Sequence, residues 1–162
     1  HGYKGKIYPV NPNRAEIFGL KCYPKLTRIR KQIDHVFIAV DGNKIIDAIM
    51  DAVSINIKCA TILSGGFSES GSEGLNLEKQ ILHIAREGNL RVLGPNSIGI
   101  INISDSVVLS ANAMLDLPNL KKGGLSVISQ SGSLIGALIA HGHRAYPCPT
   151  PVSHPHSLSA AQ

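Results

Sequence analysis

The sequence predicts an α/β fold with an open parallel sheet and helices on both faces. Three apolar runs, at residues 35–40, 59–63 and 91–93, have the composition of strands that are buried on both faces. The segments between them, 44–55 and 70–87, carry apolar residues at helical spacing. Strands joined by helical crossovers of this length run parallel with right-handed connections, which makes the predicted sheet Rossmann-like. The chain is 43% hydrophobic but only 4% aromatic, so Ile, Leu, Val and Ala must build the core.

The first predicted elements lie before residue 41. A short apolar run at 5–10 predicts a strand that ends in a turn at Asn11-Pro12-Asn13. One or two helical turns are expected within 25–31. The run HVFIAV, at 35–40, predicts the first buried strand, and Asp41-Gly42-Asn43 breaks it.

Two helices and two strands follow. Asn43 is available as the N-cap of the helix at 44–55, and CATIL, at 59–63, predicts the next strand. Ser70 and Glu73 have the spacing of a capping box at the head of the second helix. The stripe of that helix expected to face the core consists of Leu77, Ile81, Ile84 and Ala85.

The pattern changes after the strand at 91–93 and the loop Gly94–Gly99. A short strand is expected at 107–109, and the Pro/Gly/Lys-rich segment 118–124 is typical of a connector between domains. The remaining expectations are a strand at 125–128, a tight turn at 129–133, a helix starting at 134–140 and a disordered tail from Tyr146.

Composition excludes several classes of protein. A chain of 162 residues with 17% charged residues is too apolar to be disordered, and no run approaches the ~18 apolar residues of a membrane span. Cys22, Cys59 and Cys148 have no CxxC spacing, which predicts neither disulfides nor a zinc site and favours a reducing, cytoplasmic location. The chain opens on His1 without a secretory signal, and we interpret this start as a truncation.

The net charge of +5 is concentrated near the beginning of the chain. Residues 1–31 hold eight Lys or Arg against one acid, Glu16. Such a patch suits a phosphorylated small molecule, a nucleic acid or an anionic surface, or it is simply a solvated face. Nucleic acid is disfavoured because proteins that bind single strands interleave stacking aromatics with their basic residues. This region offers only four aromatic residues, all in loop-like surroundings: Tyr3, Tyr8, Phe18 and Tyr23.

Ligands of an open parallel sheet bind outside the carboxyl ends of its strands. The loops expected there are small and polar, and their glycines and N–H groups suit phosphate unless they merely close turns. These loops are 11–14, 41–43, 64–67 and 94–99. The turn Ser129–Ser133 is either an anion site or an ordinary capped turn. It matches neither the Walker motif, nor GxGxxG, nor GxSxG.

Six motifs in this order resemble the NDP-forming acyl-CoA synthetases, which include the succinyl-CoA synthetase alpha subunit and the ADP-forming acetyl-CoA synthetases. The resemblance covers roughly residues 2–142. The motifs are GYKGKIYPVNP at 2–12, IFGLKCYPKL at 17–26, FIAV at 37–40, SGGFSESGSEG at 64–74, GPNSIGIIN at 94–102 and SQSGSL at 129–134.

The resemblance implies a domain organisation and a function. Residues 1–120 would be a Rossmann-like CoA-binding domain without its first βα unit, 121–144 the start of a flavodoxin-like domain, and 145–162 a tail. Full members join an acid to CoA with interconversion of NTP, NDP and phosphate through a phosphohistidine. The implied ligand is coenzyme A, and the implied partner is an ATP-grasp nucleotide-binding subunit or domain, with no nucleic acid and no membrane.

The resemblance also implies site residues. Arg14, after Asn11 and Pro12, matches the basic residue that contacts CoA in the family. The strand-end residues that border CoA match Val40, Leu63, Ser64 and Gly65. The GPNxxG loop of the family matches residues 94–99, which makes Asn96 a further CoA-binding residue. The helix start that cradles the phosphohistidine matches Ser131, Gly132 and Ser133.

This sequence departs from the family pattern in several places. The glycine-rich loop of the family would precede residue 1, Asp41 stands where proline is usual, and the phosphorylated histidine would lie beyond the chain. His141 and His143 are too close to the turn to replace that histidine, so the isolated chain is expected to be inactive as a ligase. The alternatives are a non-catalytic CoA-binding regulatory module and an NAD(P)-binding oxidoreductase domain. The second is weakened because GxGxxG is missing and because the predicted strand at 5–10 runs into Asn11 rather than an acid.

Overall fold

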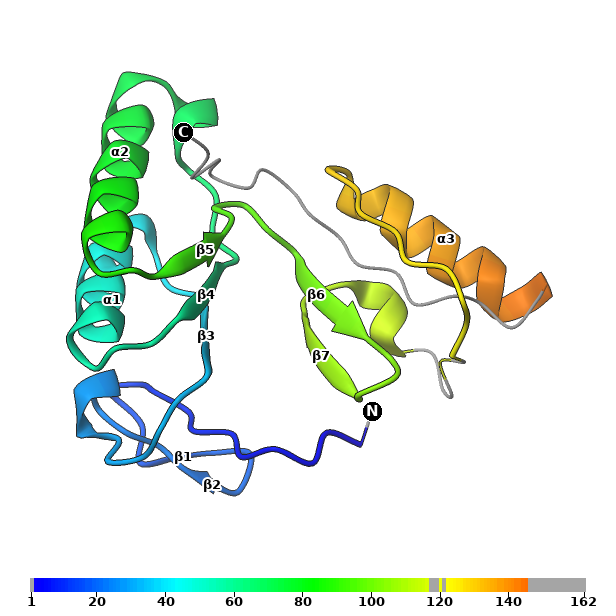
Figure 1. Ribbon diagram of the computed structural model, residues 1–162, viewed down its shortest axis with the longest axis horizontal. Helices are drawn as coiled ribbons and strands as arrows, with labels where there is room; N and C mark the ends of the chain where they lie inside the picture. Colours follow the sequence, from blue (N-terminus) through cyan, green and yellow to red (C-terminus); the bar gives the residue numbers. More distant parts are fainter. Residues whose placement is uncertain (1, 117–119, 121, 146–162) are drawn as a thin grey trace.

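The computed structural model describes residues 2–116, 120 and 122–145 (Figure 1). The predicted tail from Tyr146 and part of the predicted connector at 118–124 lie outside the described residues. The helices of the described chain are α1 (Gly42–Ser54), α2 (Ser72–Glu87) and α3 (Gly132–Ala145). None of these helices is long and apolar enough to cross a membrane.

The central sheet confirms the predicted parallel architecture. Its strands are β3 (His35–Ile38), β4 (Cys59–Ile62) and β5 (Arg91–Leu93), in the order β3-β4-β5. His35 pairs with Cys59 and Cys59 pairs with Arg91, both in parallel register. The carboxyl ends of the strands therefore lie at one edge of the sheet. The loops that follow these strands meet there, as predicted.

The crossover helices α1 and α2 pack against each other on one side of this sheet (Figure 1). When successive strands are added in one direction through right-handed crossovers, both helices fall on the same face. In this view the hairpin of β6 (Gly99–Asn102) and β7 (Val107–Ser110) and helix α3 lie on the other side of the strands from α1 and α2.

The main hydrophobic core lies between the sheet and these two helices. Ile45 and Ile49 of α1, Ile62 of β4 and Ile81 of α2 have no exposed surface. Within the predicted α2 stripe, Ile81 and Ala85 are buried, whereas Leu77 and Ile84 are partly buried against the same core. At roughly 25 cal/mol per Å² of apolar surface, this burial is the main force that holds the helices on the sheet.

The two predicted helix caps are wrong. The N-cap of α1 is Asp41, and Asn43 lies inside the first turn. Ser70 belongs to the 3-10 helix η2 (Ser68–Ser70), and Gly71 is the N-cap of α2, with no side-chain cap. Gly71 adopts φ 96°, so the chain reverses there between two helical segments, and Ser70 is already part of the preceding one.

The predicted strand at 5–10 does not form. Only Val10 makes an isolated bridge, to Tyr23, while the Tyr23 N–H donates 2.9 Å to the Pro9 carbonyl. Pro9 has no N–H of its own, so a continuous ladder is interrupted there. The predicted turn is confirmed by a 2.9 Å hydrogen bond from the Asn13 N–H to Asn11 Oδ1.

A hairpin that was not predicted follows this turn. Its strands are β1 (Glu16–Ile17) and β2 (Leu20–Lys21), which pair antiparallel. Phe18 and Gly19 at its tip both have positive φ, 51° and 75°, as a tight two-residue hairpin loop requires. The 3-10 helix η1 (Leu26–Arg28) confirms the helical turn expected at 25–31.

A second antiparallel hairpin follows the central sheet. The predicted strand at 107–109 forms as β7 (Val107–Ser110), and it pairs with β6 (Gly99–Asn102), which was not predicted. The predicted strand at 125–128 is wrong, because only Val127 makes an isolated bridge.

The third helix packs on this hairpin rather than on the first core. Ile135 and Ile139 of α3 are buried with Ile101 of β6 in a second cluster, which includes Met114 of the 3-10 helix η3 (Ala113–Asp116). The predicted helix is therefore confirmed, with its start two residues earlier than expected.

Candidate functional site

The carboxyl ends of the three parallel strands are tied together by hydrogen bonds between their loops. The Ser64 hydroxyl, after β4, donates 2.6 Å to the Val40 carbonyl, after β3. The Asn96 N–H, after β5, donates 2.9 Å to the Ser64 carbonyl. Three of the predicted site residues thus form one continuous edge.

Two further backbone hydrogen bonds extend the ladder to this edge. The Leu63 N–H donates 2.9 Å to the Ile38 carbonyl, and the Ser97 N–H donates 3.1 Å to the Ile62 carbonyl. Gly65 is exposed, and a Cβ there would lie 3.5 Å from Asn96 Oδ1. Glu69 Oε1 lies closer, 3.1 Å from that Cβ position, so the exposed backbone of Gly65 is bordered by a carboxylate on one side and by the exposed Asn96 amide on the other.

The loop after β5 depends on glycine. Gly94 has φ 101°, and a Cβ at this position would lie 2.5 Å from the Ile62 carbonyl oxygen. The Gly94–Pro95 peptide is cis, and Asn96 follows with φ 53° and an exposed side chain. This backbone path carries the Asn96 amide to the edge of the sheet.

Two glutamates shape the loop after β4, and sequence patterns did not identify them as site residues. Glu69 Oε1 accepts a 2.8 Å hydrogen bond from the Gly66 N–H, and Glu78 Oε2 accepts one of 3.3 Å from the Ser68 N–H. These carboxylates satisfy loop donors that have no partner within a strand or helix.

Asp41, the acid noted above as a departure from the expected pattern, is paired. Its carboxylate lies 3.3 Å from Lys44 Nζ, and both side chains are exposed. An exposed pair of this kind partly offsets the local negative charge at the start of α1 and adds little to stability.

The predicted site residues near the beginning of the chain lie in a separate loop. Asn11 accepts from Asn13 and donates its N–H to the Tyr23 carbonyl, so its hydrogen bonds stay within this segment. Pro12 and Arg14 are exposed. Within the described residues, the Arg14 guanidinium makes no hydrogen bond or ion pair, which leaves its donors available to an anion.

The predicted phosphate cradle coincides with the start of α3. The Leu134 N–H donates 3.3 Å to Ser131 Oγ, and the Ser131 N–H donates 3.0 Å to Ser129 Oγ. Ser131 thus caps the helix through its hydroxyl, while Ser133 is exposed in the first turn. The positive end of the α3 dipole points outward at this turn.

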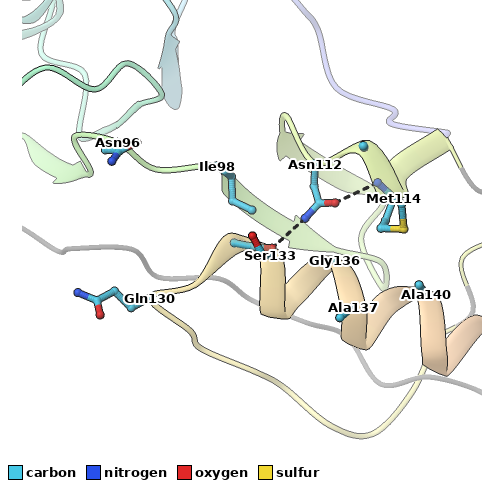
Figure 2. A pocket seen from close by; sticks show the side chains of 11 residues that line it. Asn96, Ile98, Asn112, Met114, Gln130, Ser133, Gly136, Ala137 and Ala140 are labelled. Carbon is cyan, nitrogen blue, oxygen red and sulfur yellow. Dashed lines mark hydrogen bonds between the residues drawn. The ribbon is translucent and has the colours of Figure 1, made fainter.

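A cavity of about 590 Å³ brings the sheet edge and the start of α3 together. Asn96 lines one side and Gly132 and Ser133 line another, while Asn112 and Met114 form a further wall (Figure 2). Two groups of residues far apart in the sequence therefore share one space. No sequence pattern pointed to Asn112, which lies three residues after the predicted strand at 107–109.

His35 lies away from this cavity, at the amino end of β3. Its Nε2 is 3.0 Å from the hydroxyl oxygen of Thr61, which is fully buried. Burial lowers the pKa of His35 below its usual 6.5. Burial therefore favours the neutral imidazole, whose contact with Thr61 links β3 to β4.

One family model and several known proteins are similar to this chain. A family model described as a CoA binding domain matches residues 1–103. Over 139 residues, 86% of this chain, the sequence is 37% identical to an acetate–CoA ligase [ADP-forming] II of Archaeoglobus fulgidus. Over 137 residues, 85% of this chain, it is 37% identical to an acetate–CoA ligase [ADP-forming] of Methanocaldococcus jannaschii.

A solved structure is also similar. The apo form of a dinucleotide forming acetyl-coenzyme A synthetase 1 of Candidatus Korarchaeum cryptofilum matches with a TM-score of 0.87 and 30% identity. That match covers 99% of this chain and 34% of the other. The chain spans only 20% and 19% of the two ligases named above. Since the family model matches more than half of the 162 residues, the chain belongs to the CoA-binding domain family.

Proposed function

We propose that this chain is the CoA-binding portion of an NDP-forming acyl-CoA synthetase. The whole protein would join an acid to CoA while NTP is converted to NDP and phosphate through a phosphohistidine. The similarity to ligases whose names specify ADP formation supports this proposal.

The observation that carries the proposal is the shared cavity. It is lined by Asn96 from the predicted CoA-binding edge and by Ser133 from the predicted phosphate cradle. Transfer of an acyl group between phosphate and a thiol requires both to reach one space, since proximity supplies much of the rate. This arrangement is what such a reaction needs from this part of the protein.

The residues at the edge fit a polyanion with a long, flexible arm. Gly65 offers exposed backbone, and Ser64, Leu63 and Val40 form the wall beside it. Arg14 provides a planar guanidinium suited to phosphate. In this proposal these residues bind CoA, with its thiol end directed toward Asn96.

The start of α3 would stabilise the phosphorylated histidine. A helix N-terminus contributes only about 1 kcal/mol to an exposed anion, so it cannot supply the chemistry alone. Within the described part of the chain, no histidine lines the cavity. We therefore propose that an ATP-grasp subunit or domain charges a histidine that comes from another segment of the whole protein.

We also propose that residues 121–144 begin a second, flavodoxin-like unit. The cluster of Ile101, Ile135 and Ile139 is separate from the main core, which supports a second centre of packing around α3. We further propose a reducing, cytoplasmic location, which the odd number of cysteines without CxxC spacing favours.

Titration calorimetry with CoA and with NAD tests the proposal. We expect CoA to bind more tightly than NAD, and 3′-phosphoadenosine compounds to compete with it. Arg14→Ala should weaken CoA binding, whereas Arg91→Ala should not, because Arg91 is an exposed arginine at the opposite, amino edge of the sheet. Tighter binding of NAD than of CoA would favour the oxidoreductase alternative instead.

A further inference from the structure

The side chain of Asn112 connects two segments that line the cavity. Its Oδ1 accepts a 3.0 Å hydrogen bond from the Met114 N–H, within its own segment. Its Nδ2 donates a 3.4 Å hydrogen bond to the Gly132 carbonyl, in the first turn of α3 (Figure 2). One amide thus uses both of its functional ends to hold η3 and α3 together.

Two glycines one turn apart allow α3 to come this close. A Cβ on Gly132 would lie 2.6 Å from Ile98 Cδ1, and a Cβ on Gly136 would lie 3.3 Å from Asn112 Oδ1. Residues four apart share one helix face, so this face of α3 rests on Ile98 and Asn112. The Ala111 N–H donates 3.1 Å to the Ile98 carbonyl, which links these two supports to each other.

The deeper part of α3 is held differently. Ile135 and Ile139 are buried in the second core cluster and fix the body of the helix by apolar contact. Ser131 and Ser133, in contrast, are exposed. The placement of the first turn therefore depends on Ile98 and on the directional hydrogen bond from Asn112.

We propose that Asn112 is a positioning residue that holds the first turn of α3 beside Asn96, so that an anion at Ser131–Ser133 shares the cavity with the thiol end of CoA. This inference rests on the proposed role of that turn as a phosphate cradle. Asn112 acts through the Gly132 carbonyl and does not itself contact the anion.

The test uses inorganic phosphate as the probe, with the Ser133 amide signal followed by NMR, and CoA binding measured separately by calorimetry. In Asn112→Ala we expect about fivefold weaker phosphate binding at Ser133, as the loss of one hydrogen bond implies. CoA affinity in the absence of phosphate should stay within about twofold of the wild-type value.

Asn102→Ala is the matched control. Asn102, at the end of β6, also uses both ends of its amide, with Asp105, but it does not line the cavity. It should leave both affinities unchanged. Asn112→Leu is the second variant, because it keeps the approximate size of the side chain, removes the donor to Gly132 and adds no charge beside the anion. It should also weaken phosphate binding selectively.

Each outcome separates this inference from the proposed function. If wild-type and Asn112→Ala proteins bind phosphate at Ser133 equally well, the positioning role is refuted and the CoA-binding proposal stands. Equal loss of both ligands in both folded variants would assign Asn112 a general structural role and overturn the inference. A wild-type protein with no phosphate response at Ser133 also overturns it, while calorimetry with CoA still tests the proposed function.

Discussion

The Ser64 hydroxyl donates a 2.6 Å hydrogen bond to the carbonyl oxygen of Val40. This contact joins the loop after β4 to the loop after β3, at the edge where parallel sheets bind ligands. A residue predicted only to border CoA is therefore also a structural link between two of the loops that form the proposed site.

Ser64→Ala should cost about 1 kcal/mol of unfolding free energy, because one hydrogen bond is lost. It should also weaken CoA binding, because the two loops are no longer held together. Urea unfolding and calorimetry measure the two effects. The control is Ser54→Ala, which removes a 2.7 Å hydrogen bond to Asp51 at the far end of α1 and should leave CoA affinity unchanged. Equal CoA affinities for both variants would contradict this account of the edge.

Gly94→Ala should destabilise the fold by about 2 kcal/mol or more, because alanine is strained at positive φ and its Cβ would meet a fixed carbonyl. The φ of 101° and the 2.5 Å approach to the Ile62 oxygen both require glycine. The comparison is Gly124→Ala, where a Cβ meets nothing within 4 Å. In chemical denaturation, the midpoint of Gly94→Ala should lie clearly below that of Gly124→Ala. Similar midpoints for the two variants would mean that the loop after β5 relaxes to accept the alanine.

Phe67→Ala should cost about 3–5 kcal/mol, because it leaves a cavity in the main core. Phe67 is fully buried, whereas Phe18, at the tip of the β1–β2 hairpin, is fully exposed. Phe18→Ala should therefore change stability by no more than about 0.5 kcal/mol. The two free energies of unfolding test the position of the core, and a larger loss at Phe18 would be incompatible with it.

Stability should fall as the pH is lowered through 6.5, the ordinary pKa of histidine. Burial lowers the pKa of His35, so below 6.5 the unfolded chain binds a proton that the folded chain resists. Stability is therefore gained as the pH rises through this window. Thermal unfolding of wild-type and His35→Gln proteins at several pH values checks it. If stability depends on pH equally steeply in both proteins, His35 is not the group responsible.

Regular elements could be predicted where a long pattern determined them. The strands at 35–38 and 59–62 were found because continuous apolar runs are typical of strands in parallel sheets. The central strand β4 is mostly buried, as such a run predicts, whereas the edge strand β3 is only partly buried. Helix α2 followed from the spacing of Ile81 and Ala85, which face the core. Its capping box did not form, since Gly71 reverses the chain just before the helix and local spacing does not report that path.

Strand β6 could not be predicted, because its register depends on a partner rather than on its own pattern. Gly99 lies across from Ser110, and a Cβ on Gly99 would lie 1.8 Å from the Leu109 carbonyl oxygen. The contribution of Asn112 to the cavity could not be predicted for the same reason. Its hydrogen bond to Gly132 exists only once the tertiary fold brings the two residues together. Site residues on one edge were therefore predictable, whereas the contact between the edge and α3 was not.

The proposed binding site for CoA is the carboxyl edge of β3, β4 and β5. Mapping of ¹H–¹⁵N chemical shifts during a CoA titration tests it most directly, since each backbone amide of the edge reports separately. We expect the largest shifts at Ser64, Gly65 and Asn96, which hydrogen bonds and close approach bring together. Shifts concentrated at His35, Cys59 and Arg91, on the amino edge, or a titration with no shifts at all, would contradict it.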